Sequence, residues 1–235
     1  MKRILTSILF CIFLIPISVH ARTQYIEQEN ARFQQGLLQN AVNYLDHLCL
    51  DQLDALANIA DSEVARSGEW VRIKPALEAL YTQIPGVYFY VLPDGSYYSI
   101  ALDKTSLNLA NRPYFNALFA GERIRGYPVY SRSSGKKSVI LAVPIKNEEG
   151  QVTGALGASL FLEELRTQVE AEIPIPPDYT WFVINNEGDT LLDRDVDYLF
   201  MNTITQGTPS MKTAIMGALA EESGAISYDL GAARR

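Results

Sequence analysis

The stretch Val87–Ala101, VYFYVLPDGSYYSIA, decides the fold of this chain. Residues 87–92 are all aromatic or aliphatic. After Pro93-Asp94-Gly95, residues 96–101 (Ser-Tyr-Tyr-Ser-Ile-Ala) again contain aromatic and aliphatic side chains. Short runs of this kind, joined by a turn that ends in Gly, are typical of two antiparallel strands in a hairpin. The sequence therefore predicts an antiparallel sheet that contains these two strands.

Towards the N-terminus the apolar period changes from strand-like to helical. From about Thr23 to Arg66 there is no Pro, and apolar residues recur at steps of three and four. They are Leu38, Val42, Leu45, Cys49, Leu53, Leu56, Ala60 and Val64. This predicts a long amphipathic helix packed against the sheet, and its heptad-like steps also permit a homodimer seam. Pro75 is expected in the first turn of a second helix that ends near Gln83.

Towards the C-terminus short strands and helices follow one another. We expect strands at 126–131, 137–144, 152–162, 179–184, 190–192 and 225–230, and helices at 111–120, at 163–171 and from Pro209 to near Gly224. The helices lie mostly outside consecutive hairpins, so the predicted class is α+β. A Pro-rich break at 173–177 separates two parts that repeat the same order of elements weakly.

The first residues have the pattern of an export signal. Lys2 and Arg3 precede an apolar run from Ile4 to Val19, and small residues stand near Ala21. This predicts a secretory signal peptide over residues 1–21 and a periplasmic protein. The alternative is an uncleaved anchor in the inner membrane, although the run is shorter than the roughly 20 residues that a spanning helix needs.

Composition favours a binding or sensing module over an enzyme. The formal charge is -7, and an acidic chain is a poor candidate for binding nucleic acid. Two Cys and two His leave little for histidine catalysis, a metal site or a disulfide scaffold. We therefore expect no enzyme activity, no metal and no cofactor. Cys49, on the helical stripe, is expected to be a buried, inert thiol.

Two motifs begin like known sites and then fail. Gly135-Lys136-Lys137-Ser138 ends like a phosphate loop, but Tyr130 stands where the first Gly is required. Asp193, Asp195 and Asp197 alternate like a calcium loop that lacks its Gly and its bidentate Glu, so we expect a solvated acidic loop.

Several segments together resemble a known family. They are Asn111-Arg112-Pro113-Tyr114-Phe115, Tyr127-Pro128-Val129-Tyr130-Ser131, Ser134-Gly135-Lys136-Lys137, Ala142-Val143-Pro144-Ile145, Gly154-Ala155-Leu156-Gly157-Ala158, and Tyr179–Ile184 with Glu187–Leu192. In this order and spacing the chain resembles a double Cache domain. The resemblance implies a long N-terminal helix at 22–70, a membrane-distal module at 71–172 and a partial membrane-proximal module at 173–235.

The family implies an extracytoplasmic sensor with a PAS-like fold. Small ligands bind in the distal module, between its sheet and the helix-loop segment that covers it. Such modules belong to chemoreceptors, histidine kinases or cyclic-dinucleotide enzymes. No transmembrane helix or output domain follows the second module here, which indicates a free-standing periplasmic protein or a truncated receptor.

The resemblance also indicates where the ligand would lie. Arg112, Tyr114 and Phe115 match the family's Arg–x–aromatic–aromatic segment, in which the Arg fork binds a carboxylate; the alternative is a structural Arg that caps backbone carbonyls. The following strand would bring Tyr130 and Ser131 to the same pocket. Strand alternation allows only one of Tyr127 and Tyr130 to face the ligand, and Tyr130 is favoured.

Ser159 stands where amino-acid-sensing members carry an Asp that holds the ligand ammonium. Because a neutral hydroxyl cannot supply that charge, amino acids are disfavoured and a small carboxylate is favoured. The leading hypothesis is a non-catalytic sensor that signals through a membrane receptor or kinase. The alternative is a scaffold protein whose pocket is filled by its own side chains.

Overall fold

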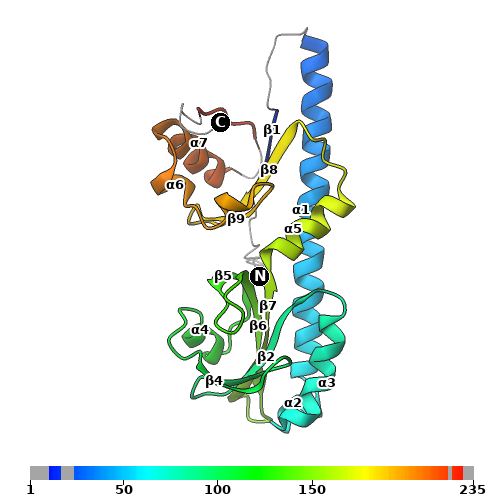
Figure 1. Ribbon diagram of the computed structural model, residues 1–235, viewed down its shortest axis with the longest axis vertical. Helices are drawn as coiled ribbons and strands as arrows, with labels where there is room; N and C mark the ends of the chain where they lie inside the picture. The colour runs from blue at the N-terminus through cyan, green and yellow to red at the C-terminus, as the bar shows by residue number, and fades with distance from the viewer. Residues whose placement is uncertain (1–10, 17–23, 222–223, 230–235) are drawn as a thin grey trace. The chain divides into compact units, whose positions relative to one another are not determined.

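The computed structural model describes residues 11–16, 24–221 and 224–229. It separates into two compact units, which we call the central unit (residues 45–165) and the terminal unit (the described residues of 1–44 and 166–235). Helix α1 (Gln24–Ala60) contributes residues to both units (Figure 1). The modules expected at 71–172 and 173–235 stay a prediction.

The central unit is built on a sheet of six strands. In chain order these are β2 (Gly86–Val91), β3 (Ser96–Ser99), β4 (Asp103–Asn108), β5 (Ile124–Tyr130), β6 (Lys137–Lys146) and β7 (Val152–Phe161). They pair antiparallel in the order β4-β3-β2-β7-β6-β5, which confirms the α+β class. Strand β4 was not predicted, because its DKTSLN sequence is polar and almost wholly exposed, as an edge strand can be.

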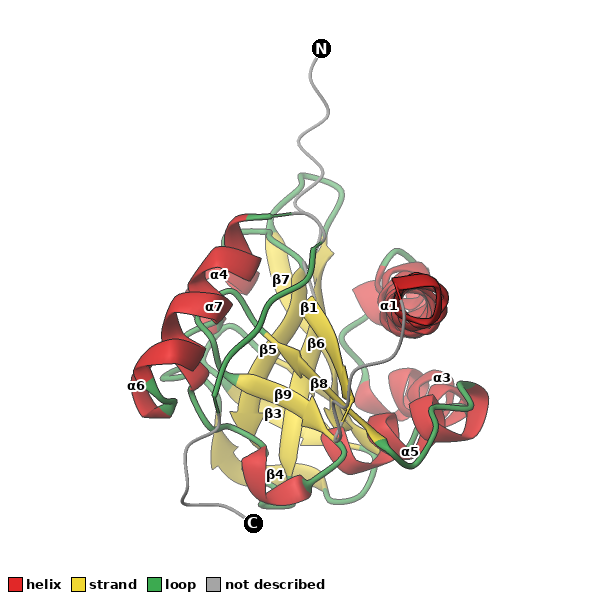
Figure 2. Cartoon of the chain, turned by 90° about the horizontal axis from the view of Figure 1, so that it is seen from above, coloured by secondary structure: helices red, strands yellow, loops and turns green. Residues whose placement is uncertain are grey.

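Helices lie on both faces of this sheet (Figure 2). One side carries the part of α1 within the unit and α3 (Trp70–Tyr81), with α2 (Glu63–Arg66) beside them; the other side carries α4 (Phe115–Phe119). The predicted apolar stripe of α1 is buried from Leu45 to Ala60, where the long helix ends. Cys49 lies on this stripe and is buried, as predicted, which raises the pKa of its thiol to about 12.

Helix α3 begins earlier than the sequence indicated. It starts at Trp70, so Pro75 lies inside the helix and not in its first turn. The bond that Pro75 cannot donate would have reached the carbonyl of Val71. Val71 is one of the most exposed residues, at 83%, so water can reach this turn and the Pro is tolerated.

Strand β2 faces the helices of one side through Tyr88. This side chain is fully buried, and its hydroxyl lies 2.9 Å from the carbonyl oxygen of Ile84 and 3.0 Å from Oε1 of Gln52 on α1. The Gln52 amide donates in turn to Gln83 Oε1 at 3.2 Å. Buried polar groups are costly unless they are paired, so these bonds fix α1 and the end of α3 to the sheet.

The next residue, Phe89, faces the opposite side of the sheet. Its partner across β2 and β7 is Gly157. A Cβ at Gly157 would lie 2.3 Å from the Phe89 ring, so the glycine makes room for the ring. Phe89 belongs to the apolar cluster that α4 covers, together with Tyr114, Phe115 and Leu118.

The terminal unit contains a smaller sheet, in the order β1-β8-β9. Its strands are β1 (Cys11–Pro16), β8 (Tyr179–Ile184) and β9 (Thr190–Asp193). Its helices include η1 (Val196–Tyr198), α6 (Thr203–Gln206), α7 (Pro209–Ala220) and, from Arg166 on, α5 (Leu162–Glu172). Strand β8 has the predicted bounds, and Thr208 caps α7 as predicted, accepting a hydrogen bond from the Met211 amide.

The strand predicted at 225–230 is wrong over its described residues. Residues 225–229 adopt no regular structure, and residue 230 lies outside the described residues. The alternating apolar residues of this segment nevertheless pack: Ile226 and Tyr228 lie against the cluster formed by Phe182, Ile184, Met211 and Ile215. The alternating apolar residues therefore reflect packing of this segment against the cluster and not pairing with a strand.

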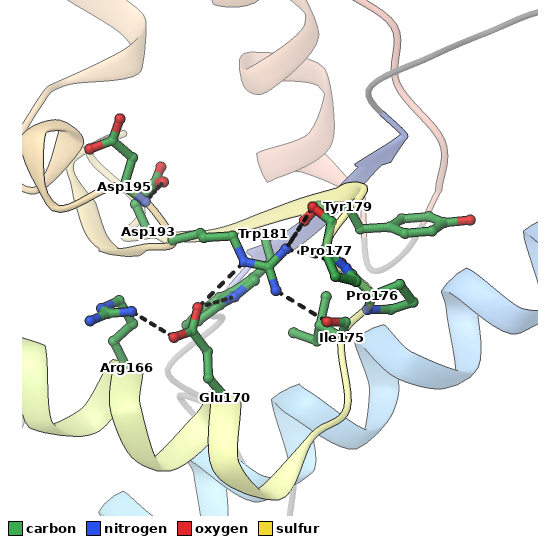
Figure 3. A network of polar contacts seen from close by, with 10 residues as sticks. Arg166, Glu170, Ile175, Pro176, Pro177, Tyr179, Trp181, Asp193 and Asp195 are labelled. Carbon is green, nitrogen blue, oxygen red and sulfur yellow. Dashed lines mark hydrogen bonds and ion pairs between the residues drawn. The ribbon is translucent and has the colours of Figure 1, made fainter.

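The Pro-rich connector between α5 and β8 is held by Arg194. Figure 3 labels the connector residues and Glu170 below them. The Arg194 guanidinium donates to the carbonyls of Ile175 at 3.1 Å and Pro176 at 3.0 Å, and to that of Tyr179. Glu170 of α5 accepts from Arg194, from the Trp181 indole at 3.3 Å and from Arg166 at 2.6 Å. Because prolines have no N–H, this connector depends on an external donor for its order.

Asp193 corrects the expectation of a solvated acidic loop. It ends β9 and is only 8% exposed, and its Oδ1 accepts a bond of 2.8 Å from the Asp195 amide. Burial raises the pKa of Asp193 to about 6, and this carboxylate contributes to a raised pKa at Tyr228. The regular spacing of Asp193, Asp195 and Asp197 suggested one exposed loop, but Asp193 is the last residue of β9.

No helix within the described residues has the length and apolar character needed to cross a membrane.

Gly157→Ala should lower the free energy of unfolding of the central unit by about 1–3 kcal/mol, because the new methyl group displaces the buried Phe89 ring. The control is Gly36→Ala in α1, where nothing lies within 4 Å of the added Cβ. That change should stabilise the helix by about 0.5–1 kcal/mol. Thermal unfolding checks both; equal effects of the two changes would contradict the packing described.

Asp193→Asn should stabilise the terminal unit at pH 7.5 by on the order of 1–2 kcal/mol. Burial raises the pKa of Asp193 to about 6 in the folded state, whereas in the unfolded chain the carboxyl has the ordinary aspartate pKa of about 3.9. The wild type therefore loses stability as pH rises from about 4 to 6, and the advantage of the variant should vanish below about pH 4. Urea unfolding at pH 4, 5.5 and 7.5 tests this; a constant difference across that range would contradict it.

Candidate functional site

A small cavity lies in the central unit on the face covered by α4. The described residues that line it come from β2, β3, β5, β6, β7 and the loops around α4 and after β5. They are Val87, Phe89, Tyr97, Leu109, Arg112, Tyr114, Val129, Ser131, Arg132, Ser133, Ile140 and Ser159. Four of the six residues predicted from the sequence are among them: Arg112, Tyr114, Ser131 and Ser159.

Arg112 stands at the turn just before α4. Its Nη2 donates to the backbone carbonyl of Tyr130 at 2.7 Å, which ties the α4 segment to the end of β5. The Arg112 Nε is buried and has no hydrogen-bond partner in the structure. The bond to Tyr130 confirms the alternative in which Arg112 caps a backbone carbonyl, while its contact with a ligand stays a prediction.

Arg132 is a second cation at the cavity, and the sequence analysis missed it. Its guanidinium donates to the Asn108 carbonyl at 2.8 Å and to Asn111 Oδ1 at 2.5 Å. These bonds connect the loop after β5 to the end of β4 and to the segment that follows it. The signal that could have found it is its place directly after Ser131, since an Arg next to a pocket residue can reach the pocket with its long side chain.

Ser131 and Ser159 reach the cavity differently. Ser131 begins the turn before β6, where its amide donates to the Lys136 carbonyl at 2.9 Å and its carbonyl accepts from the Gly135 amide at 2.8 Å. Ser159 lies within β7, opposite Val87 and Ile140 of the neighbouring strands. It is 4% exposed, and its hydroxyl has no hydrogen-bond partner in the structure.

Tyr114 and Phe115 are both buried, but only Tyr114 reaches the cavity. Burial raises the pKa of the Tyr114 phenol to about 12, while the charges of Arg112 and Arg132 act in the opposite direction. Phe115 packs on Phe119 with ring centres 4.5 Å apart. It belongs to the apolar cluster, so its side chain packs α4 against the sheet.

Tyr130 is not among the residues that line the cavity. The residue is 56% exposed, and its carbonyl accepts the bond from Arg112. The register shift in β5 falls before Tyr127, so regular alternation holds at the end of the strand. Val129 therefore faces the cavity and Tyr130 faces outward, while Tyr127 packs on Tyr114 with ring centres 5.6 Å apart.

The cavity is small and positively charged. Its free volume is about 20 Å³, where one ordered water needs about 10–15 Å³ by the same measure. Two guanidinium groups border it, and none of the described residues that line it is an Asp or Glu. Elsewhere in the described part of the chain, no group of three or more His, Cys, Asp or Glu side chains is placed to hold a metal ion.

Ser159→Ala should leave stability unchanged or raise it by up to about 1 kcal/mol, because it removes a buried hydroxyl that has no partner. The matched control is Ser138→Ala in β6, where the buried hydroxyl donates to the Lys136 carbonyl at 3.1 Å. Loss of that bond should cost about 1 kcal/mol. Chemical denaturation measures both; a larger loss at Ser159 than at Ser138 would show that the Ser159 hydroxyl is paired.

Known proteins match this chain by structure and not by sequence. No protein-family profile and no curated protein matches it. The ligand-binding domain of the Pseudomonas aeruginosa amino acid chemoreceptor PctB, in complex with L-Arg, is 16% identical with a TM-score of 0.61, over 80% of each chain. The sensor domain of the V. cholerae histidine kinase DctB is 16% identical with a TM-score of 0.58, over 83% of this chain and 78% of that one.

The ligand-binding domain of the Pseudomonas fluorescens chemoreceptor CtaA, in complex with L-valine, is 18% identical with a TM-score of 0.55, over 68% of this chain and 74% of that one. At such identities the likeness concerns the fold. It confirms the fold implied by the resemblance to double Cache domains: this chain folds as the ligand-binding sensor domains of chemoreceptors and of a sensor histidine kinase do.

Proposed function

We propose that this protein is a non-catalytic extracytoplasmic sensor that binds a small carboxylate in the cavity of the central unit. The observation that carries the proposal is the pair of buried polar atoms at that cavity, Arg112 Nε and Ser159 Oγ, which have no partner in the structure. The fold of the structural neighbours, which are ligand-binding sensor domains, supports the same conclusion.

Unpaired polar atoms in a protein interior need an explanation. Leaving a buried donor or acceptor unpaired costs about 1–3 kcal/mol, and native structures pair nearly all of them. A carboxylate between Arg112 and Ser159 would accept from both atoms at once. Charge-assisted bonds of this kind are about twice as strong as neutral ones. A bound carboxylate would therefore offset the cost of leaving these two atoms unpaired.

The charge at the cavity favours an anion without an ammonium group. Arg112 and Arg132 are both cations, and Ser159 is neutral where an amino-acid ligand would need a carboxylate partner. The neighbours solved with L-Arg and L-valine are amino-acid-binding proteins by their descriptions. We propose that this chain keeps their fold and binds a carboxylate that carries no amino group.

The free volume favours a short ligand. About 20 Å³ holds little more than the carboxylate group itself. Longer ligands would require the turn at 131–136 or the Arg132 side chain to move. The same small volume is the observation that favours the second candidate, a scaffold protein whose pocket is filled by Phe89, Tyr97 and Tyr114.

The remaining parts of the proposal concern the cellular setting. We propose export with removal of residues 1–21, a long helix at 22–70, a ligand-binding module at 71–172 and a second module at 173–235. Because no output activity is expected of such modules, the signal would pass to a membrane receptor or kinase. A homodimer through the exposed residues of α1 would fit the same arrangement.

A thermal-shift panel tests the function. It should contain formate, acetate, propionate and succinate, with methylamine and ethylamine as amines and glycine, alanine and aspartate as amino acids. Binding at 100 times Kd contributes about 2.7 kcal/mol, a rise in Tm on the order of 5–10 °C, and we expect it for short carboxylates alone. Arg112→Ala should abolish the rise, while Arg125→Ala, at an exposed position of β5 outside the cavity, should preserve it.

Two results would overturn this function. A flat response to the whole panel would favour the filled scaffold. An unchanged rise in the Arg112→Ala variant would move the ligand away from this cavity.

A further inference from the structure

The strand β8 has a neighbour on each side in the described part of the chain. β9 pairs with one edge and β1 with the other, both antiparallel. The pairing with β1 runs the whole length of β8, from Cys11 opposite Ile184 to Pro16 opposite Tyr179. The two strands lie side by side in Figure 1. A segment from the start of the chain thus completes a sheet whose other strands lie some 165 residues later, from Tyr179 onward.

The central unit shows what normally stands in this position. There β2 forms a hairpin with β3 on one edge and pairs with β7 on the other, again antiparallel. β8 and β9 form the corresponding hairpin in the terminal unit. β1 therefore occupies in the terminal sheet the place that β7 occupies in the central sheet.

The backbone groups of β8 that face β1 can be identified from the other edge. The Trp181 carbonyl accepts from the Arg194 amide at 3.2 Å, so Trp181 points its backbone groups towards β9. Alternation then points those of Val183 to the same side. The backbone groups of Thr180, Phe182 and Ile184 face β1.

This edge has none of the features that keep an exposed strand from pairing. The sequence Tyr-Thr-Trp-Phe-Val-Ile contains no charged residue, no Pro and no Gly. Natural edge strands are usually interrupted by such residues because a flat apolar edge recruits other strands. An edge of this kind is suited to binding an extended segment by strand addition.

We propose that the outer edge of β8 is an acceptor for an extended, uncharged strand of a signalling partner, which adds antiparallel. β1 holds this place in the full chain and shows the chemistry of the occupant, since Cys-Ile-Phe-Leu-Ile-Pro is apolar throughout. The proposal rests on the proposed removal of residues 1–21, which takes β1 away from this edge. It does not depend on the ligand of the central unit.

Amide hydrogen exchange on the full chain, resolved by NMR, tests the acceptor. Phe13 stands opposite Phe182, so Phe13→Pro removes a backbone N–H that faces β8, while the control Phe13→Ala keeps it. In Phe13→Pro the amides of Thr180, Phe182 and Ile184 should exchange at least about 10-fold faster (a loss of about 1.4 kcal/mol of protection). Trp181 and Val183, bonded to β9, should not change.

A peptide added in trans then tests the occupant. It carries residues 11–16, with Cys11→Ser and two Lys at each end for solubility. It should restore slow exchange at the three outer amides of the Phe13→Pro protein, and the same peptide with Pro in place of Phe13 should not. Fast exchange at Trp181 and Val183 as well would show that β1 is an integral strand, and would overturn the acceptor role.

Two further outcomes also overturn the proposal. Failure of the peptide to restore protection would show that the edge does not accept a strand. Protection without peptide, together with a dimer mass by light scattering, would assign the edge to a second copy of the chain. If no compound of the thermal-shift panel raises Tm, the exchange rates of the β8 amides are unaffected. The proposed ligand and the proposed acceptor edge can therefore fail independently.

Discussion

Two consecutive side chains of β2 tie the central unit together. Tyr88 carries its buried hydroxyl to α1 and to the end of α3 on one face of the sheet. Phe89 fills the other face, over the glycine that makes room for its ring. Because strand residues alternate with a period of two, a one-residue shift of β2 would turn both side chains to the wrong face of the sheet. The position of the helices and the shape of the cavity are consequently set by one strand.

The cavity follows from where the packing around Phe89 ends. Apolar residues of the cluster fill most of this face, and the polar groups collect where the loop before α4 meets the loop after β5. Arg112 and Arg132 each bond backbone carbonyls across this junction, so they hold the two loops together and bring positive charge to the same place. The structural role of these side chains and the proposed binding role therefore fall on the same groups. A ligand carboxylate would extend a network that the fold already requires.

The sequence predicted the elements whose pattern is local and missed those whose partners are distant. The β2–β3 hairpin and β8 were predictable because aromatic and β-branched runs stand between turn residues. Arg112, Tyr114, Ser131 and Ser159 could be placed at one pocket through the order of the motifs. Arg132 could not, because its reach across to Asn108 is a tertiary property. The direction of Tyr130 required the register of β5, and the pairing of β1 required a strand that only the folded chain brings near.

The placement of the two tryptophans gives each unit its own optical signal. Trp70 belongs to the central unit, is partly exposed, and stacks on Tyr98 with ring centres 5.5 Å apart. Trp181 belongs to the terminal unit and is fully buried beside Glu170. The sequence has only these two, so a chain with either one replaced by Phe reports the unfolding of a single unit. Fluorescence can therefore resolve whether the units melt together or one after the other, without any added dye.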